Sequence, residues 1–522
     1  HWRASARWGK GSGRCGDGPT RRPVIRMQRR SVAQGSRRGH LWGRCGRLAV
    51  GPVGGLALAS VLLESPLSLV AWGGVGSASP CSRHARRCVE PSSGCGHPPP
   101  RLPSLGDHLL LWHCGASFSF ACDADQVLAV ALEEFHALAS LQLQLRPRAA
   151  VEGSASRAAL RPTEPAPAGS PGGRPQLWAL GAGVLQPEEL REVARRCIFL
   201  RAAYRPVACG ASAVDCAQAA EAAVRSWSEE KRARAWALSH VRGVHHGARM
   251  GTTAAIEGFT AALELLGPVR LDAPETPLAV LEEYASEAKE HMTWEEAVLR
   301  RVWFLEVLGE KSHHWMKPYM LENRQYLSQT TTRPEVAMLL ANLAQVRQGD
   351  RVLDPCCGSG GLLLAAAAVG ATELWGIDAN PDAIEARRPA RPRRGRGGSP
   401  AKEGLAGNFA DLGLPEPEFE CGDALDPGLR AYKQQYDALL ADLPYGWREF
   451  AEHHSLRDLA VGVLKVAARV LRPGRRAVVT WPEQEAAGAV AEATAVGLRV
   501  VASLGFDIHK KLRRRIFVLE QP

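Results

Sequence analysis

Hydrophobic residues change their spacing partway along the chain. Upstream, apolar residues at helical spacing over 127–141 alternate with short strand-like runs such as 278–284, which predicts an α+β region over 123–300. The charged stretch 295–308 is interpreted as a helical connector. Downstream, over 313–522, short apolar runs separated by helices predict an α/β fold, a Rossmann-like parallel sheet of about seven strands with crossover helices.

A helix is expected at the start of this C-terminal part. Thr332, Pro334 and Glu335 have the pattern of a capped first turn, and the helix is predicted over 336–346. It precedes the first strand of the predicted sheet.

The first strand of the C-terminal part leads into a glycine-rich turn. Residues 351–354 end at Asp354, and the following turn, PCCGSGG, contains Gly358 and Gly360 before an Ala/Leu-rich helix over 362–369. Glycine lets the backbone approach a ligand closely, but a tight strand-to-helix turn also uses glycine for packing alone. The turn and Asp354 are therefore candidates for cofactor binding that depend on their surroundings.

Two further strand ends carry carboxylates. The second strand ends at Asp378, about 20 residues beyond the turn, where a carboxylate can accept both ribose hydroxyls of an adenosyl ligand. That position suits NAD and S-adenosylmethionine equally. The third strand ends at Asp423, which is placed to accept from an adenine amine and so favours S-adenosylmethionine. Either residue could instead be a solvated aspartate at a strand end.

The fourth strand, residues 436–441, ends in Asp442-Leu443-Pro444-Tyr445. An exocyclic amine conjugated to a nucleobase ring is a poor nucleophile. The Asp442 carboxylate and the Leu443 carbonyl form an acceptor pair for its two N–H groups. Pro444 turns the chain, and Tyr445 is placed to stack on a flipped base. These four residues predict catalysis at a nucleobase amine, and the alternative is a turn that only closes a strand.

The excess positive charge lies at the N-terminal end. The formal net charge is +11, and residues 1–120 carry 17 Lys/Arg against 4 Asp/Glu. Residues 1–122 are rich in Arg, Gly, Ser and Pro, which predicts a low-complexity tail that is disordered or non-native. Two prolines and a glutamate interrupt the apolar stretch 48–72, so we expect no membrane span. A cytoplasmic location is expected, with an organellar one as the alternative if the tail is a transit segment.

The cysteines do not form a metal-binding pattern. Seven of the 13 lie in the tail at irregular spacings, and the sequence contains no CxxC pair. The adjacent Cys356 and Cys357 lie in the glycine turn. We therefore predict a reducing compartment and no metal site.

Several motifs together resemble one enzyme family. They are residues 326–335 (YLSQTTTRPE), Leu340-Ala341-Asn342, Asp354-Pro355 with Gly358 and Gly360, Asn408 before Leu412-Gly413-Leu414, and residues 442–446 (DLPYG). Over residues 125–522 the chain resembles the catalytic subunit of the eukaryotic, THUMP-type tRNA guanosine-10 N2-methyltransferases, which have the class I methyltransferase fold. The resemblance implies S-adenosyl-L-methionine as cofactor, tRNA as substrate and an EC 2.1.1.- activity that forms N2-methylguanosine.

Weaker similarity extends upstream, in residues 195–200 (RRCIFL), 267–272 (GPVRLD) and 279–282 (AVLE). It implies a ferredoxin-like and THUMP RNA-binding region that binds a tRNA end. The family also implies a small zinc-binding activator subunit as a partner.

The sequence departs from the family in three places. The usual Asp-Pro-Pro-Tyr has Leu443 in its second position here, as in other THUMP-type guanosine methyltransferases, so the RNA and the nucleotide stay open. The Arg/Pro/Gly insertion 387–398 is either a solvated loop or a phosphate contact. A basic cluster near the last strand either contacts an RNA backbone or guards an exposed strand edge, and it consists of Lys510, Lys511, Arg513, Arg514 and Arg515.

Two other functions fit the same residues. An adenine-N6 methyltransferase acting on DNA or RNA would use the same acceptor pair, because both amines present two N–H groups. A non-catalytic RNA-binding subunit could retain the fold, although intact Asp442, Pro444 and Tyr445 argue against it. Analysis of methylated nucleosides separates the two enzymes.

Overall fold

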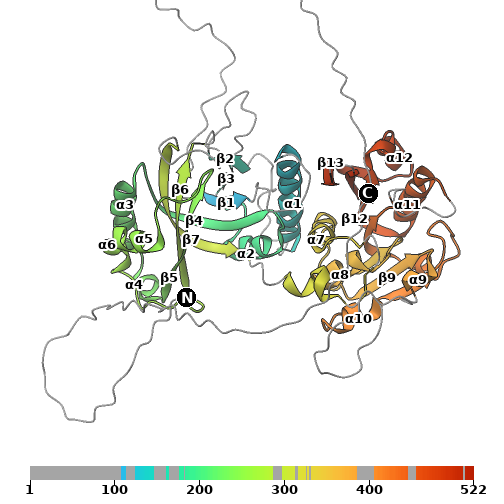
Figure 1. Ribbon diagram of the computed structural model, residues 1–522, viewed down its shortest axis with the longest axis horizontal. Helices are drawn as coiled ribbons and strands as arrows, with labels where there is room; N and C mark the ends of the chain where they lie inside the picture. Colours follow the sequence, from blue (N-terminus) through green and yellow to red (C-terminus); the bar gives the residue numbers. More distant parts are fainter. Residues whose placement is uncertain are drawn as a thin grey trace, which may run out of the picture. The chain divides into compact units, whose positions relative to one another are not determined.

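The computed structural model contains two seven-stranded β-sheets, formed by residues 108–310 and 351–520 (Figure 1). The residues that it describes are 107–112, 124–145, 160–163, 176–181, 183–285, 297–311, 316–324, 326–327, 331–384, 405–444, 454–509 and 512–522. All of these residues belong to one compact unit of the chain, Gly94–Pro522. The predicted tail therefore lies outside the described residues, except for residues 107–112.

The first half of the first sheet has βαββαβ connectivity. Its strands lie in the order β2-β3-β1-β4, and each neighbouring pair is antiparallel. This is the arrangement of the ferredoxin-like fold. The elements are β1 (His108–Trp112), α1 (Ala124–Leu145), β2 (Leu160–Pro162), β3 (Leu177–Leu180), α2 (Pro187–Arg196) and β4 (Leu200–Gly210).

Strand β1 corrects the boundary at residue 122 that the sequence predicts for the tail. All five residues of β1 are buried, and the strand pairs with β3 on one side and β4 on the other. Leu109 to Trp112 are consecutive apolar residues buried on both faces, so the strand lacks the alternation that marks a half-exposed strand. The first sheet therefore includes residues that precede position 123.

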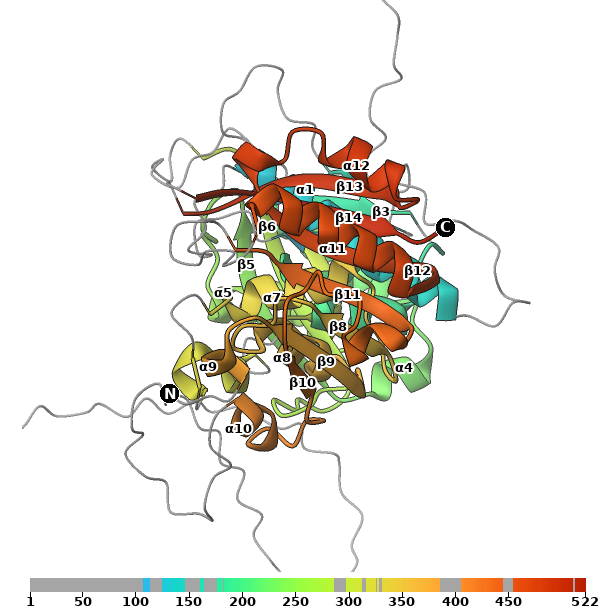
Figure 2. The same cartoon turned by 90° about the vertical axis from the view of Figure 1, so that its right-hand side faces the viewer.

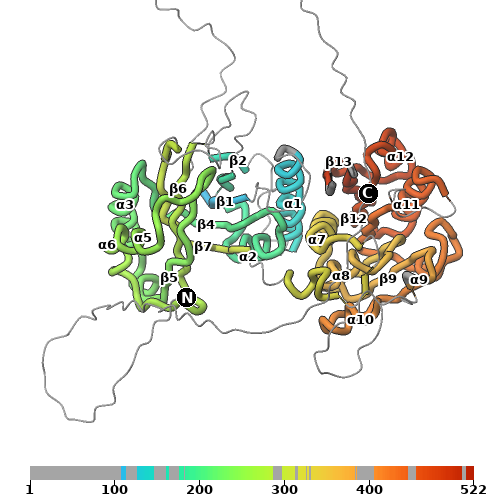
Figure 3. The backbone as a smooth tube through the Cα atoms, viewed as in Figure 1, coloured from blue at the N-terminus to red at the C-terminus, as the bar shows by residue number. Residues whose placement is uncertain are grey.

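The second half of this sheet continues the first without a break, because β7 pairs with β4. The order continues as β4-β7-β6-β5, with β5 and β6 parallel. Helices α3, α5 and α6 pack on one face of these strands (Figure 3). The elements are α3 (Ala213–Arg225), α4 (Glu229–Ala233), β5 (Trp236–Val244), α5 (Thr252–Gly258), α6 (Thr260–Leu263), β6 (Thr276–Tyr284) and β7 (Leu299–Glu310).

Strand β7 corrects two further expectations. The sequence predicts a helical connector over 295–308 and an upstream region that ends at residue 300, whereas Leu299–Glu310 is a central strand paired with β4 and β6. Val302, Trp303 and Phe304 are buried, and β-branched and aromatic residues favour strands. Pairing on both sides outweighs the local pattern of charges.

The second sheet has the strand order β10-β9-β8-β11-β12-β14-β13 (Figure 2). The strands from β10 to β12 are parallel, and β14 is antiparallel to both of its neighbours. This is the arrangement of class I methyltransferases, so the predicted fold class is confirmed for the C-terminal part. The strands are β8 (Arg351–Asp354), β9 (Glu373–Asp378), β10 (Glu418–Cys421), β11 (Tyr436–Asp442), β12 (Leu471–Pro482), β13 (Arg499–His509) and β14 (Leu512–Glu520).

Helices cover both faces of the second sheet. Helices α7 (Pro334–Leu343) and α8 (Gly361–Ala368) pack on one face, and α11 (Leu456–Val470) and α12 (Ala489–Ala495) pack on the other. Within the described ranges, no helix combines the length and apolar character needed to cross a membrane. The remaining helices are short: η3 (Lys317–Tyr319), η4 (Leu321–Asn323), α9 (Pro381–Ile384), α10 (Leu405–Ala410), η5 (Arg430–Lys433) and η6 (Glu483–Glu485).

A buried polar network joins α1 and α2 to α7. Glu134 of α1 and Asn342 of α7 are fully buried, and Asn342 Nδ2 donates to Glu134 Oε1 at 2.7 Å. Arg196, at the end of α2, donates through Nη2 to Asn342 Oδ1 at 3.0 Å and to the Val346 carbonyl at 2.9 Å. The Ile198 amide donates to Glu134 Oε1 at 2.8 Å. Because buried polar groups need specific partners, this network fixes α7 against α1 and α2.

Candidate active site

The predicted cofactor loop connects β8 to α8 as a tight turn. Gly358 and Gly360 have φ angles of +49° and +72°, in the left-handed region that glycine adopts without strain. The Cys357 amide donates to the Ile377 carbonyl of β9 at 2.8 Å, which holds the turn against the neighbouring strand. A Cβ atom added to Gly358 would meet nothing within 4 Å among the described residues, so the backbone is accessible there.

Asp354 ends β8 and is completely buried. Its Oδ1 accepts from the Cys356 amide at 3.1 Å, whereas Oδ2 has no hydrogen-bond partner in the part of the chain that the structure describes. Burial raises the pKa of this carboxyl well above its ordinary value, and the charges of Asp378 and Asp442 raise it further. A cationic ligand group would stabilise such a carboxylate. The ammonium group of S-adenosylmethionine is such a cation, so the residues present fit this cofactor.

Asp378 ends β9 and contacts the glycine turn directly. Its Oδ2 accepts from the Gly358 amide at 2.8 Å, and its Oδ1 accepts from the Asn380 amide at 2.9 Å. The structure thus brings Asp354, the turn and Asp378 together at one edge of the sheet. Acceptance of ribose hydroxyls by Asp378 stays a prediction.

Asp423 follows β10 and is paired with a histidine that the sequence analysis missed. Asp423 Oδ2 lies 2.7 Å from His454 Nε2, and Oδ1 accepts from the Leu425 amide at 2.9 Å. His454 lies 31 residues along the chain, just before α11, and no motif connects the two positions. An adenine amine bound at Asp423 would therefore share the carboxylate with His454.

Asp442 ends β11 and is held by side chains from three other parts of the fold. Its Oδ1 accepts from Arg514 Nη1 at 3.0 Å and from Thr480 Oγ1, and its Oδ2 accepts from Thr332 Oγ1 at 2.7 Å. Thr480 lies opposite Asp442 in the register of β11 and β12, Arg514 is in β14, and Thr332 precedes α7. These bonds fix the carboxylate at the sheet edge that also carries Asp354.

Thr332 differs from the helix cap that the sequence predicts. The N-cap of α7 is Arg333, which makes no side-chain capping bond, and the Thr332 hydroxyl donates to Asp442 instead. Thr331 Oγ1 lies 2.9 Å from Ser359 Oγ in the glycine turn. The segment before α7 therefore connects the cofactor loop to the aspartate of the fourth strand.

Of the other three residues of the predicted catalytic motif, the structure describes Leu443 and Pro444. Leu443 is 1% exposed and packs in the apolar core, so only its backbone can reach a ligand. Pro444 is half-buried. Tyr445, the insertion 387–398, and the pair Lys510 and Lys511 lie outside the described residues.

The three arginines of the basic cluster differ in exposure and in their partners. The Arg513 side chain is 74% exposed, whereas that of Arg514 is 6% exposed and pairs with Asp442. Arg515 pairs with Glu483 at 2.7 Å. Arg514 is therefore a residue of the candidate site, not part of an RNA contact or a guarded edge. Sequence reasoning missed it because 72 residues separate it from Asp442.

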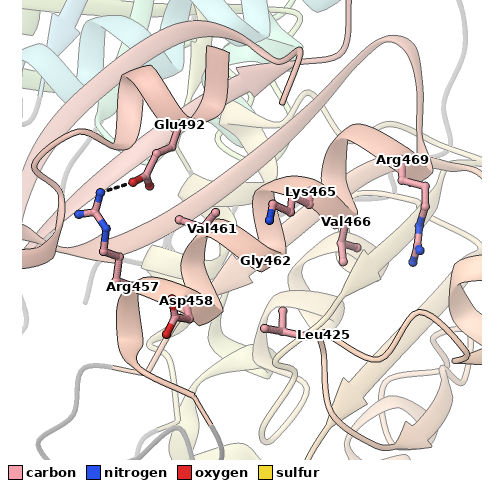
Figure 4. Close-up of a pocket in the computed structure, with 9 residues that line it drawn as sticks. All are labelled: Leu425, Arg457, Asp458, Val461, Gly462, Lys465, Val466, Arg469 and Glu492. Atoms are coloured by element: carbon pink, nitrogen blue, oxygen red, sulfur yellow. Dashed lines mark hydrogen bonds and ion pairs between the residues drawn. The ribbon is translucent and has the colours of Figure 1, made fainter. Parts of the chain in front are cut away.

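A pocket of about 660 Å³ opens along α11, and none of the predicted site residues lines it (Figure 4). Arg457 of α11 binds Glu492 of α12 at one end of this pocket. At its floor, a Cβ atom on Gly462 would lie 2.1 Å from Leu425 Cδ2, so the helix packs directly on that loop. Over the described residues, no group of three or more His, Cys, Asp or Glu side chains is arranged to hold a metal ion.

Residues 322–388 match a methyltransferase domain. The matching family model is UPF0020, described as RMKL-like, methyltransferase domain, and the matched segment contains Thr332, Asp354, the glycine turn and Asp378. The chain is 27% identical over 210 residues to the tRNA (guanine(10)-N(2))-methyltransferase TRMT11 of Bos taurus, covering 39% of this chain and 44% of that protein. It is 28% identical over 142 residues to the tRNA (guanine(10)-N2)-dimethyltransferase of Methanothermobacter thermautotrophicus, covering 27% of this chain and 35% of that protein.

Among solved structures, TrmN from Thermus thermophilus is similar with a TM-score of 0.33 and 20% identity, over 67% of this chain and 90% of that one. The chain spans less than half the length of the two curated relatives just named. The family match and the strand order of the second sheet agree on a class I methyltransferase fold.

Proposed function

We propose that this chain is an S-adenosylmethionine-dependent RNA methyltransferase that forms N2-methylguanosine at guanosine 10 of tRNA. The observation that carries the proposal is the position of Asp442, a carboxylate held at the end of β11 on the same sheet edge as Asp354 and the glycine turn. The names of the relatives that the chain resembles, both tRNA guanine-10 N2-methylating enzymes, support guanine in tRNA over other acceptors.

The residues around the glycine turn are proposed to bind the cofactor. S-adenosylmethionine supplies an electrophilic methyl group on a sulfonium. Asp354 would pair with its ammonium, and Asp378 would accept from its ribose hydroxyls. Asp423 would accept from its adenine amine, and the accessible backbone at Gly358 lets the cofactor approach the turn.

Asp442 is proposed to act on the guanine amine. The nitrogen lone pair is conjugated with the ring, so the nitrogen must become tetrahedral before it can attack. The Asp442 carboxylate and the Leu443 carbonyl would accept its two N–H groups and favour that geometry. Because the nitrogen gains positive charge as it is methylated, the carboxylate stabilises the transition state more than the ground state. Tyr445 would stack on the base.

The first sheet is proposed to bind the tRNA. Its ferredoxin-like half and the helix-covered half that follows it support a THUMP-type RNA-binding region. The resemblance of the motifs extends the proposal to a small zinc-binding activator subunit and to tRNA processing in the cytoplasm. Imaging of a tagged chain would distinguish the cytoplasm from an organelle.

Methyl transfer to defined RNAs tests the proposed function. The full chain, with and without a co-expressed activator subunit, is given labelled cofactor and tRNA transcripts with guanosine or adenosine at position 10. We expect N2-methylguanosine by nucleoside mass spectrometry only with guanosine there. N6-methyladenosine in RNA or DNA would indicate the adenine-specific enzyme instead. RNA binding without cofactor binding would indicate a non-catalytic subunit.

A further inference from the structure

Arg514 has a charged side chain that is buried within the second sheet. It lies in β14 with 5% of its surface exposed, and its guanidinium reaches Asp442 Oδ1 at 3.0 Å. A buried charge is costly unless it is paired and hydrogen-bonded. Asp442 is the acid with which it forms an ion pair, so the position of Arg514 depends on the carboxylate at the centre of the candidate site.

Two hydroxyl groups also donate to this carboxylate. Thr480 Oγ1 donates to the oxygen that Arg514 contacts, and Thr332 Oγ1 donates to the other oxygen. The donors come from β12, β14 and the segment before α7, so three separate parts of the fold orient the carboxylate.

The nearby Asp354 carboxylate gives Arg514 a second role besides orienting Asp442. The charges of Asp354 and Asp442 act on each other, and they are carried by neighbouring parallel strands, β8 and β11. Two carboxylates near each other disfavour simultaneous ionisation. A guanidinium bonded to Asp442 offsets that repulsion, because arginine keeps its charge in proteins.

We propose that Arg514 is a positioning residue for methyl transfer, which orients Asp442 and keeps it a charged acceptor beside Asp354. This inference rests on the proposed function of Asp442. Arg514 acts through the carboxylate and does not touch the RNA. The strand gives a direct contrast, because the neighbouring Arg513 has a 74% exposed side chain.

The test compares Arg514→Gln and Arg514→Lys with a control, Arg499→Gln. Arg499 of β13 also pairs with a carboxylate, Glu520 of β14, but its side chain is 59% exposed. Single-turnover methyl transfer is measured at saturating tRNA and cofactor. RNA affinity and cofactor affinity are measured separately, and thermal unfolding shows that each variant is folded.

We expect Arg514→Gln to lower the single-turnover rate by about 100-fold, the scale of loss when a reacting group is misplaced by about 1 Å. RNA affinity should stay at the wild-type value. Arg514→Lys keeps the charge but loses the planar fork, so its rate should lie between those of Arg514→Gln and wild type. Arg499→Gln should match wild type.

Three outcomes would overturn the inference while wild type forms N2-methylguanosine. One is a wild-type rate for Arg514→Gln. Another is a loss of RNA affinity with an unchanged saturating rate, which would make Arg514 a phosphate contact. The third applies if Arg514→Gln does not fold. The inference would then be overturned if Arg514→Lys kept the full rate and Thr480→Val, which removes a donor to the same oxygen, also kept it. Absence of methyl transfer by wild type would instead contradict the proposed function.

Discussion

At the scale of single residues, two aspartates of the candidate site have opposite surroundings. Asp442 accepts hydrogen bonds from three side chains, one of them a guanidinium. Asp354 is fully buried, and within the described part of the chain its one donor is the backbone amide of Cys356. Asp442 is therefore arranged to stay charged and in place, whereas Asp354 gains most from a cation delivered by a ligand.

Replacement of Asp442 tests its catalytic assignment. Asp442→Ala should lower the single-turnover rate by on the order of 100-fold or more, because a preorganised group that stabilises developing charge is lost. RNA affinity should change little, since the interaction strengthens only in the transition state. Asp437→Asn is the control, because Asp437 lies in the same strand but pairs with Arg472. A near-normal rate for Asp442→Ala would reduce the motif to a structural turn.

Asp354 should make cofactor binding depend on pH. Its pKa is raised by burial, so below that raised pKa the carboxyl is protonated and cannot pair with an ammonium. Cofactor affinity should therefore weaken as the pH falls through the raised pKa, and binding should release protons. Calorimetry in buffers of different ionisation enthalpy measures both effects. Asp354→Asn should bind weakly without this dependence, and equal affinity of wild type at every acidic pH would contradict the assignment.

Some residues of this site could be predicted from the sequence, and others could not. Asp354, Asp378 and Asp442 could be predicted because each ends a parallel strand, and such ends share one sheet edge. Arg514 and His454 could not, because each meets its carboxylate 72 or 31 residues away without a recurring spacing. Only the tertiary fold brings those residues together.

At the scale of elements, hydrophobic patterning predicted the second sheet better than the first. Strands β8, β9 and β11 are short apolar runs followed by helices, as the sequence indicates. Strands β1 and β7 were assigned wrongly for different reasons. The first lies beside a low-complexity segment, and the second carries charges at its ends that suggest a helix. Their strand pairing is non-local, so residue spacing along the chain does not reveal it.

Gly376 of β9 is a packing position that supports the glycine turn. A Cβ atom there would lie 2.8 Å from Phe419 Cδ1 and 2.9 Å from Cys357 Sγ. Gly376→Ala should therefore destabilise the fold by about 1–3 kcal/mol through overpacking, and weaken cofactor binding by displacing the turn.

The matched control is Gly258→Ala, because a Cβ at this position of α5 meets nothing within 4 Å among the described residues. That variant should be stabilised by about 0.5–1 kcal/mol, since alanine favours helix over glycine. Denaturant unfolding measures both changes. Equal stability of the two variants would show that β9 and the turn can move apart without cost.

At the scale of the whole molecule, the two sheets are connected through α7. Its C-terminal half carries Asn342, which is bound to Glu134 and Arg196, and its first turn follows Thr332, which is bound to Asp442. Asn342 and Arg196 lie in two motifs that the sequence analysis used only for family resemblance. Their contact gives both motifs a structural role, because one helix spans the distance between the network and the candidate site.

Truncation tests the corrected start of the first sheet. A chain that begins at residue 123 lacks β1, so β3 and β4 lose their shared neighbour and two buried clusters lose Leu109 and Leu110. We expect this chain to be insoluble or to lose the unfolding transition of the first sheet. A chain that begins at residue 105 retains β1 and is the control. Equal solubility and thermal stability of the two chains would show that β1 is dispensable.

Strand β4 belongs to both halves of the first sheet, since it pairs with β1 on one edge and with β7 on the other. Because the strand is shared, neither half of the sheet is complete without the other. Recombination could therefore not replace one half alone. Amide protons of β4 exchange with solvent only when the sheet opens. Their protection from exchange therefore measures the stability of both halves together. Sequence variation is therefore expected to accumulate in the helices and loops around this sheet, while its central strands change together.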